Sequence, residues 1–180
     1  MQIEKTHLEG LLIIKPDVFR DARGYFYEPY NRKKFEAAGI TVEFVQDNQS
    51  LSNKGTIRGL HFQSPPFEQG KLVRVVKGAV LDVVVDIRKN SPDYGKHFLI
   101  ELSETNFLQF WIPAGFAHGF SVLEDQTIFE YKCSNYYSRP SEAGILWNDM
   151  DLGINWQVGD PVVSEKDQLL PLFKDFKSPF

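Results

Sequence analysis

The chain contains four histidines, and two of them stand in surroundings suited to chemistry. His61 and His118 are each flanked by bulky apolar side chains and by a glycine one or two positions away, which lets the backbone approach another group closely. A neutral imidazole has a reference pKa of about 6.5 and can therefore remove a proton near neutral pH. His7 and His97 have polar neighbours near expected strand ends, so we expect them at the surface.

Other candidates have a structural interpretation when taken singly. Phe129, Tyr131 and Cys133 are every second residue of an expected strand, so their side chains share an inward face. Taken by itself, Tyr131 is therefore interpreted as a core aromatic residue. A buried histidine is likewise more often structural than catalytic. Asp82 is different, because it lies in a strongly apolar strand where a carboxylate needs a partner.

The elements that must position these residues are strands. Aromatic residues make up 14% of the chain, beside 13 glycines and 10 prolines, which favours strands and turns. From Lys71 to Ile87, two strands that are apolar on both faces flank a turn at Gly78, so both belong inside a sheet. Turns about ten residues apart, without alternating helices, predict an all-β, cupin-like jelly-roll barrel or sandwich. Expected strands cover residues 11–14, 23–27, 41–46, 71–77, 81–87, 97–102, 107–112, 118–123 and 127–133.

Two short peripheral helices are expected. Asn31 is a suitable N-cap for a helix over residues 32–38, and Gly39 is a suitable terminator. Ser164 and Asp167 have the spacing of a capping box, which predicts a second helix near the C-terminus.

Composition limits the remaining possibilities. A length of 180 residues fits one domain over residues 1–180. A net charge of −4 gives no basic field for nucleic acid, and no apolar stretch approaches a membrane span or a signal peptide. The single cysteine, Cys133, cannot form an internal disulfide, so we expect a cytoplasmic protein.

The run from Pro113 to His118 resembles the second motif of the cupin superfamily. A metal-binding cupin would carry His-x-His in its first motif, whereas this chain has His61 followed two positions later by Gln63. At most two imidazoles converge, which falls short of the usual ligand set. We therefore expect neither a metal nor another cofactor.

Further blocks, taken in order, are similar to the dTDP-4-dehydrorhamnose 3,5-epimerase family, whose members are metal-free cupins. The blocks cover residues 19–26, 44–50, 57–63, 69–74, 111–120, 131–137 and 145–149, with Asp167 fitting near the end. Seven ordered blocks are far more specific than a single short motif. The chain departs from the family at Trp156-Gln157, where relatives often have Trp-Pro, and this is a detail of a turn.

The resemblance implies a catalytic set. His61 would be the general base and Asp167 the carboxylate that orients its ring. Tyr131 would be the general acid on the other side of the sugar, and Lys71 would stabilise charge on the C4 oxygen. His118, paired with Asp82, would help to hold the sugar.

The resemblance also implies nucleotide contacts and a partner. The residues implied to bind the nucleotide diphosphate are Arg23, Glu28, Gln46, Asn48, Arg58, Glu142 and Lys166, with Tyr137 stacking on thymine. Arg23 and Glu28 lie on an N-terminal strand that such enzymes exchange with a second subunit. A homodimer is therefore expected.

The implied chemistry suits these residue types. Both C3 and C5 of the sugar flank a C4 ketone, which acidifies each C–H, and a nearby cation stabilises the enolate in a water-poor cavity. Inversion needs a proton delivered to the face opposite the base, and a tyrosine with a reference pKa of about 10 can deliver it at neutral pH.

Several alternatives stay open. The nearest are an epimerase acting at C3 or C5 alone and a 3,4-ketoisomerase, the latter disfavoured by Tyr131. A binding module without activity would need the nucleotide contacts but neither His61 nor Tyr131. A metal-dependent cupin oxygenase is disfavoured by Gln63.

Overall fold

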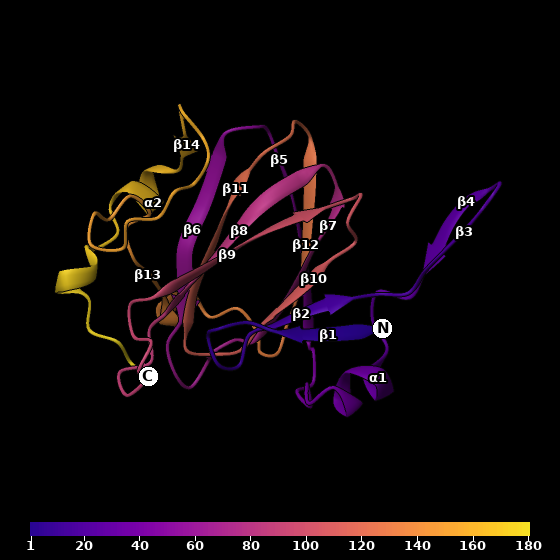
Figure 1. Cartoon of the computed structure of the whole chain (residues 1–180). Coiled ribbons are helices and arrows are strands. Elements are labelled where there is room, and N and C mark those ends of the chain that lie inside the picture. The colour runs from indigo at the N-terminus through magenta and orange to yellow at the C-terminus, as the bar shows by residue number, and fades with distance from the viewer.

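The computed structural model describes residues 1–180, and most of its strands form two sheets that face each other (Figure 1). The first sheet has the order β1 (Gln2–Lys5), β2 (Leu12–Lys15), β10 (Gln109–Ile112), β7 (Lys71–Lys77), β12 (Thr127–Cys133) and β5 (Gln46–Ser52). The second has the order β13 (Glu142–Gly144), β6 (Thr56–Gln63), β11 (Phe116–Val122), β8 (Ala79–Asp86) and β9 (His97–Ser103), with β14 (Val162–Val163) added beside β6. Neighbouring strands are antiparallel except β14 and β6, and the all-β prediction is confirmed.

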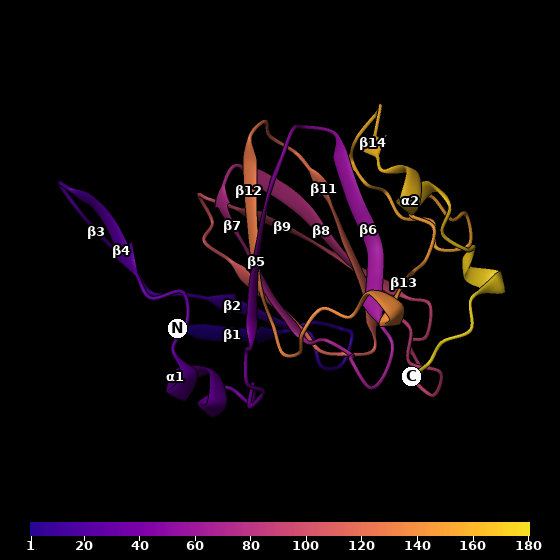
Figure 2. The same cartoon turned by 180° about the vertical axis from the view of Figure 1, so that it is seen from behind.

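The remaining regular elements are a hairpin and four short helical segments. A hairpin of β3 (Val18–Asp21) and β4 (Gly24–Tyr27) projects from the body of the molecule (Figures 1 and 2). The helices are α1 (Arg32–Ala37), α2 (Glu165–Gln168) and the 3-10 turns η1 (Arg139–Ser141) and η2 (Phe173–Asp175). None of them has the length and apolar composition that a bilayer crossing requires.

The second sheet is covered on both faces, which explains its apolar sequence. Val80 and Val84 of β8 point into the core between the sheets, where they join Phe129 of the facing sheet. The alternate residues of β8 belong to another cluster that includes Trp156 of the C-terminal region. Every residue of β8 is buried as a result, as the alternation from Lys71 to Ile87 predicts.

Both predicted helices are present. Asn31 caps α1 by accepting a hydrogen bond from the backbone N–H of Lys34, and the buried Phe35 packs beside Trp111. Ser164 caps α2 by accepting one from the N–H of Asp167 at 3.1 Å. The α2 helix is a single turn, and it is important because it carries Asp167.

One strand prediction is wrong, and several strands, of which β6 is the longest, were not predicted. Residues 41–45 form no strand, and β5 begins only at Gln46. Val42 and Phe44 do alternate inward, but they pack on the cluster around α1 and the segment lacks a neighbouring ladder. The strand β6 was not expected, because its polar residues and Gly59 obscure the alternation of residues 56–63.

Asp149 ties two parts of the C-terminal region together. Its side chain is 4% exposed, and its two oxygens accept hydrogen bonds from the backbone N–H groups of Asp151, Leu152 and Phe173. This one carboxylate therefore fixes both the turn after residue 149 and the start of η2.

We expect Asp149→Ala to lower the free energy of unfolding by about 2–3 kcal/mol, because it leaves buried N–H donors without an acceptor. Urea unfolding measures the loss. Asp151→Ala is the control, since that side chain is exposed and should change stability by less than about 0.5 kcal/mol. Equal stability of the two variants would contradict the assignment.

Candidate active site

A cavity of about 640 Å³ lies between the two sheets and is bordered by β5 and β6, which both face the viewer in Figure 2. Its apolar lining includes Phe120 and Phe129. Among the residues implied by the resemblance, those that line it are Arg58, His61, Lys71, His118, Tyr131, Lys166 and Asp167. Side chains from five different elements thus meet in one space.

His61 is oriented by Asp167. Its Nε2 lies 2.7 Å from Oδ1 of Asp167, and the other oxygen accepts a hydrogen bond from the N–H of Gly59 at 3.3 Å. Burial raises the pKa of the Asp167 carboxyl, but the hydrogen bonds from His61 and Gly59 outweigh it and hold this pKa below its ordinary value. The ionised carboxylate favours the proton on Nε2, which leaves Nδ1 as the proton acceptor.

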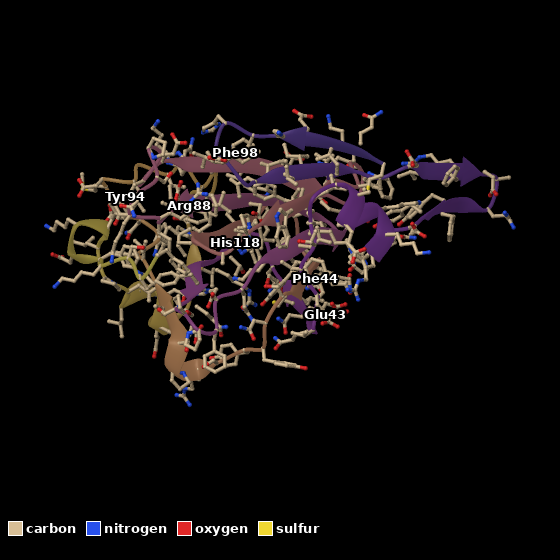
Figure 3. All side chains as sticks on the ribbon, turned by 90° about the horizontal axis from the view of Figure 1, so that it is seen from below. Glu43, Phe44, Arg88, Tyr94, Phe98 and His118 are labelled. Carbon is tan, nitrogen blue, oxygen red and sulfur yellow. The ribbon has the colours of Figure 1, made fainter.

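His118 forms a second imidazole–carboxylate pair. Its Nε2 lies 2.9 Å from Oδ2 of Asp82, and both side chains are buried, with His118 near the middle of the molecule (Figure 3). Burial lowers the pKa of His118 and raises that of Asp82. The expected partner of Asp82 is therefore present, while the other carboxylate oxygen, Oδ1, has none.

Two glycines set the spacing of these histidines. His61 and His118 are opposite each other on β6 and β11. A Cβ added to Gly59, where φ is +138°, would lie 2.5 Å from the Cα of Gly119. The glycines beside the two histidines predicted a close approach of the backbone to another group. In the structure that group is the neighbouring strand, because β6 and β11 approach each other at Gly59 and Gly119.

Lys71 and Tyr131 approach from the facing sheet. The Lys71 Nζ lies 5.9 Å from the centre of the Tyr131 ring, and both residues line the cavity. Burial lowers the pKa of the Lys71 amine and raises that of the Tyr131 phenol. The cavity thus has an imidazole on one wall and a protonated phenol beside an amine on the other.

A chain of hydrogen bonds runs beside the cavity and ends at Lys166, which lines it. Gln46 donates to Asn48 at 3.0 Å and accepts from the N–H of Tyr137 at 2.9 Å. The Tyr137 hydroxyl donates to Glu142 at 2.8 Å, and Glu142 also pairs with Lys166 at 2.5 Å. Burial raises the pKa of Glu142, but these two bonds outweigh it and lower this pKa overall.

Arg23 and Glu28 are not brought to the cavity by their own chain. Arg23 lies in the turn between β3 and β4, where it pairs with Asp21 at 2.7 Å and its side chain is 90% exposed. Glu28 follows the hairpin and pairs with Lys34 at 2.9 Å. Neither residue lines the cavity.

Two serines of the cavity wall were not predicted from the sequence. Ser52 accepts a hydrogen bond from Nε of Arg58 at 3.1 Å, and the hydroxyl of Ser50 is buried without a partner. With Gln46 and Asn48, they form a polar row on the inner face of β5. The spacing of two residues between these polar side chains indicates one face of a strand. The predicted strand covered residues 41–46, however, and so ended where this row begins.

Comparisons with known proteins agree with this geometry. A family model described as dTDP-4-dehydrorhamnose 3,5-epimerase matches residues 5–175. A protein of that name from Shigella flexneri is 54% identical over 168 residues, covering 93% of each chain.

Solved structures agree as well. The crystal structure of a dTDP-4-dehydrorhamnose 3,5-epimerase from Elizabethkingia anophelis is 51% identical, with a TM-score of 0.93 over 97% of each chain. A 3,5-epimerase from Legionella pneumophila in complex with dTDP-4-keto-L-rhamnose is 47% identical, with a TM-score of 0.94 over 98% of this chain and 94% of that one. The likeness confirms the cupin-like class expected from the sequence.

Proposed function

Because the chain belongs to the dTDP-4-dehydrorhamnose 3,5-epimerase family, we propose that it inverts C3 and C5 of dTDP-4-dehydro-6-deoxy-D-glucose to give dTDP-4-dehydro-L-rhamnose, a step toward dTDP-L-rhamnose. It is an isomerase. The observation that carries the mechanism is the shared cavity, where His61 from one sheet faces Lys71 and Tyr131 from the other.

The reaction begins with removal of a proton next to the C4 ketone. Nδ1 of His61 takes the proton, and the ionised Asp167 stabilises the imidazolium that results. The electron pair of the broken C–H bond moves onto the C4 oxygen as an enolate. The Lys71 ammonium stabilises this negative charge, and it does so more strongly in the cavity than in bulk water.

The enolate is then protonated on its other face. Tyr131 comes from the sheet opposite His61, and its raised pKa keeps it protonated until it donates. One proton leaves and one returns at each carbon. Between the two inversions His61 releases its proton to solvent and Tyr131 regains one from solvent, so the balance requires no oxidant, reductant or other cofactor. We assign the same four residues to both carbons.

The nucleotide lies at the edge of the cavity in this proposal. Arg58 and Lys166 are cations that suit the diphosphate, and the exposed ring of Tyr137 suits stacking on the thymine base. His118 and Asp82 support the sugar from the interior. Gln46, Asn48 and Glu142 hold these groups in place through the hydrogen bonds described above.

We further propose that two subunits complete each site by exchanging N-terminal strands. The projecting hairpin exposes Phe19, Tyr25 and Phe26 by 64%, 53% and 70%, which a monomer would leave in water. β5 is an end strand of its sheet and borders the cavity, so a partner segment can approach there. This arrangement would bring the partner copies of Arg23 and Glu28 to the nucleotide.

We place the reaction in the cytoplasm, where the free Cys133 stays reduced.

Incubation of the enzyme with dTDP-4-dehydro-6-deoxy-D-glucose in heavy water tests the reaction. We expect two solvent deuterons per sugar by mass spectrometry, because C3 and C5 each exchange one proton. One deuteron would indicate a single-site epimerase. None beyond the enzyme-free background would exclude epimerisation and favour the binding module.

Two variants separate the roles in the same assay. His61→Ala should abolish exchange, because no base remains. Tyr131→Phe should still exchange but invert poorly, because the opposite face lacks its proton donor. An equal and complete loss of exchange in both would contradict the assignment of one base and one opposing acid.

The pH dependence distinguishes Lys71 from Tyr131. Burial lowers the pKa of Lys71 and raises that of Tyr131, so Lys71 loses its proton first as pH rises and kcat/KM falls through the pKa of Lys71. Lys71→Arg should move this alkaline limb to higher pH, since a guanidinium stays protonated. Lys166→Arg is the matched control and should leave the limb in place. An unmoved limb in Lys71→Arg would refute the ammonium role.

Subunit mixing tests the exchanged strands. Co-expression of Arg23→Ala with His61→Ala should restore about a quarter of wild-type activity, because half of the dimers are mixed and each has one complete site. Co-expression of His61→Ala with Tyr131→Phe should restore none, since both residues belong to the same chain's site. Failure of the first pair, or recovery in the second, would argue against shared sites.

A further inference from the structure

Gln63 takes the place of a metal ligand in the cupin pattern, and the proposed reaction gives it no task. Its side chain is 5% exposed at the end of β6, two residues beyond His61. Nε2 donates to the carbonyl oxygens of Phe67 at 2.6 Å and Tyr136 at 3.1 Å. Oε1 accepts from the N–H of Ser138 at 2.7 Å. Both amide protons and the amide oxygen are thus engaged.

Two of these hydrogen bonds lie on either side of one residue, Tyr137. The carbonyl of Tyr136 belongs to the peptide group before Tyr137, and the N–H of Ser138 belongs to the peptide group after it. One side chain therefore holds both peptide planes that flank Tyr137. The N–H of Tyr137 itself donates to Gln46 at 2.9 Å, so three of the four polar groups in these two peptide planes are hydrogen-bonded.

The side chain of Tyr137 has little else to hold it. It is 55% exposed, and its hydroxyl donates to Glu142 at 2.8 Å. An exposed ring that is free to rotate must be ordered when a ligand stacks on it, which reduces affinity. A fixed backbone with a bonded hydroxyl removes part of that cost before the ligand arrives.

We propose that Gln63 is a positioning residue that pre-organises Tyr137 to stack on the nucleotide base, an inference that rests on the proposed function. The amide group is matched to this task because it donates twice and accepts once. A carboxylate of the same size has no donor, and a histidine has only two ring nitrogens.

The loop that Gln63 holds is joined to its neighbour at other points. Residues 64–70 and 134–138 lie at the end of the sheets opposite the β5–β6 turn (Figure 1). Gln69 donates to the carbonyl of Asn135 at 2.8 Å, and the N–H of Gly70 donates to the hydroxyl of Ser134 at 2.7 Å. Gln69 thus links the same two loops as Gln63 but does not flank Tyr137, which makes it a matched control.

Titration calorimetry with dTDP tests the proposal on the intact protein. Gln63→Glu removes both donors and sets a carboxylate against two carbonyl oxygens. The Kd for dTDP and the KM for the sugar nucleotide should each rise about tenfold, whereas kcat should change less than about twofold, because the reacting atoms are untouched. Gln69→Glu should leave Kd within about twofold of wild type.

A double-mutant cycle shows whether Gln63 acts through Tyr137. In a Tyr137→Ala background, Gln63→Glu should cause little further loss of dTDP affinity, because the ring that it positions is gone. Full additivity of the two losses would overturn the proposal. Gln63→Met, of similar volume, repeats the cycle if the carboxylate prevents folding.

The positioning role of Gln63 and the proposed function can be disproved separately. Unchanged dTDP affinity in Gln63→Glu, beside normal binding by the wild type, would overturn the positioning role alone. Absence of dTDP binding by the wild type would overturn the proposed function and this inference with it.

Discussion

The hydrogen bond between His61 and Asp167 joins two segments that lie 106 residues apart in the chain. Asp167 reaches the imidazole because Ser164 caps a single helical turn at this point. That turn follows β14, which pairs with the start of β6, the strand that carries His61. The C-terminal region thus serves both as a cover for the second sheet and as a support for the proposed base.

The interior of the molecule is unusual because ionisable groups and apolar side chains share it. Asp82 and His118 are buried in the core that holds the sheets together, and Lys71 lines the cavity beside it. Their burial is costly, and the pairing of Asp82 with His118 offsets part of that cost. The same low polarity strengthens any charge interaction with a bound sugar, so the groups that reduce stability are those that favour reaction.

Much of this arrangement could be predicted from the sequence. The alternation of apolar residues from Lys71 to Ile87 was sufficient to predict two interior strands. The capping residues Asn31 and Ser164 were sufficient to predict two helices. β6 was not predicted because Gly59 interrupts the alternation of its apolar residues. The same glycine allows β6 and β11 to approach each other closely. An alternating pattern also fails to distinguish a paired strand from an extended segment, which is why the predicted strand at 41–46 was misplaced.

The site was predictable to a different degree. Seven of the residues that the resemblance implied do line one cavity, and those on strands point into it because the pleat fixes which side chains share a face. The contacts of Gln63 were beyond reach, since they depend on where two loops meet in space. Arg23 and Glu28 lie outside the cavity of their own chain, and no pattern within one sequence reveals what a second copy contributes.

The contact between Gly59 and Gly119 has a consequence for how such a protein can diversify. A single methyl group on either residue would force β6 and β11 apart and move both histidines. Substitutions at this contact are therefore restricted, because either one would displace His61 and His118 together. A change of substrate preference must leave the contact between these two strands intact.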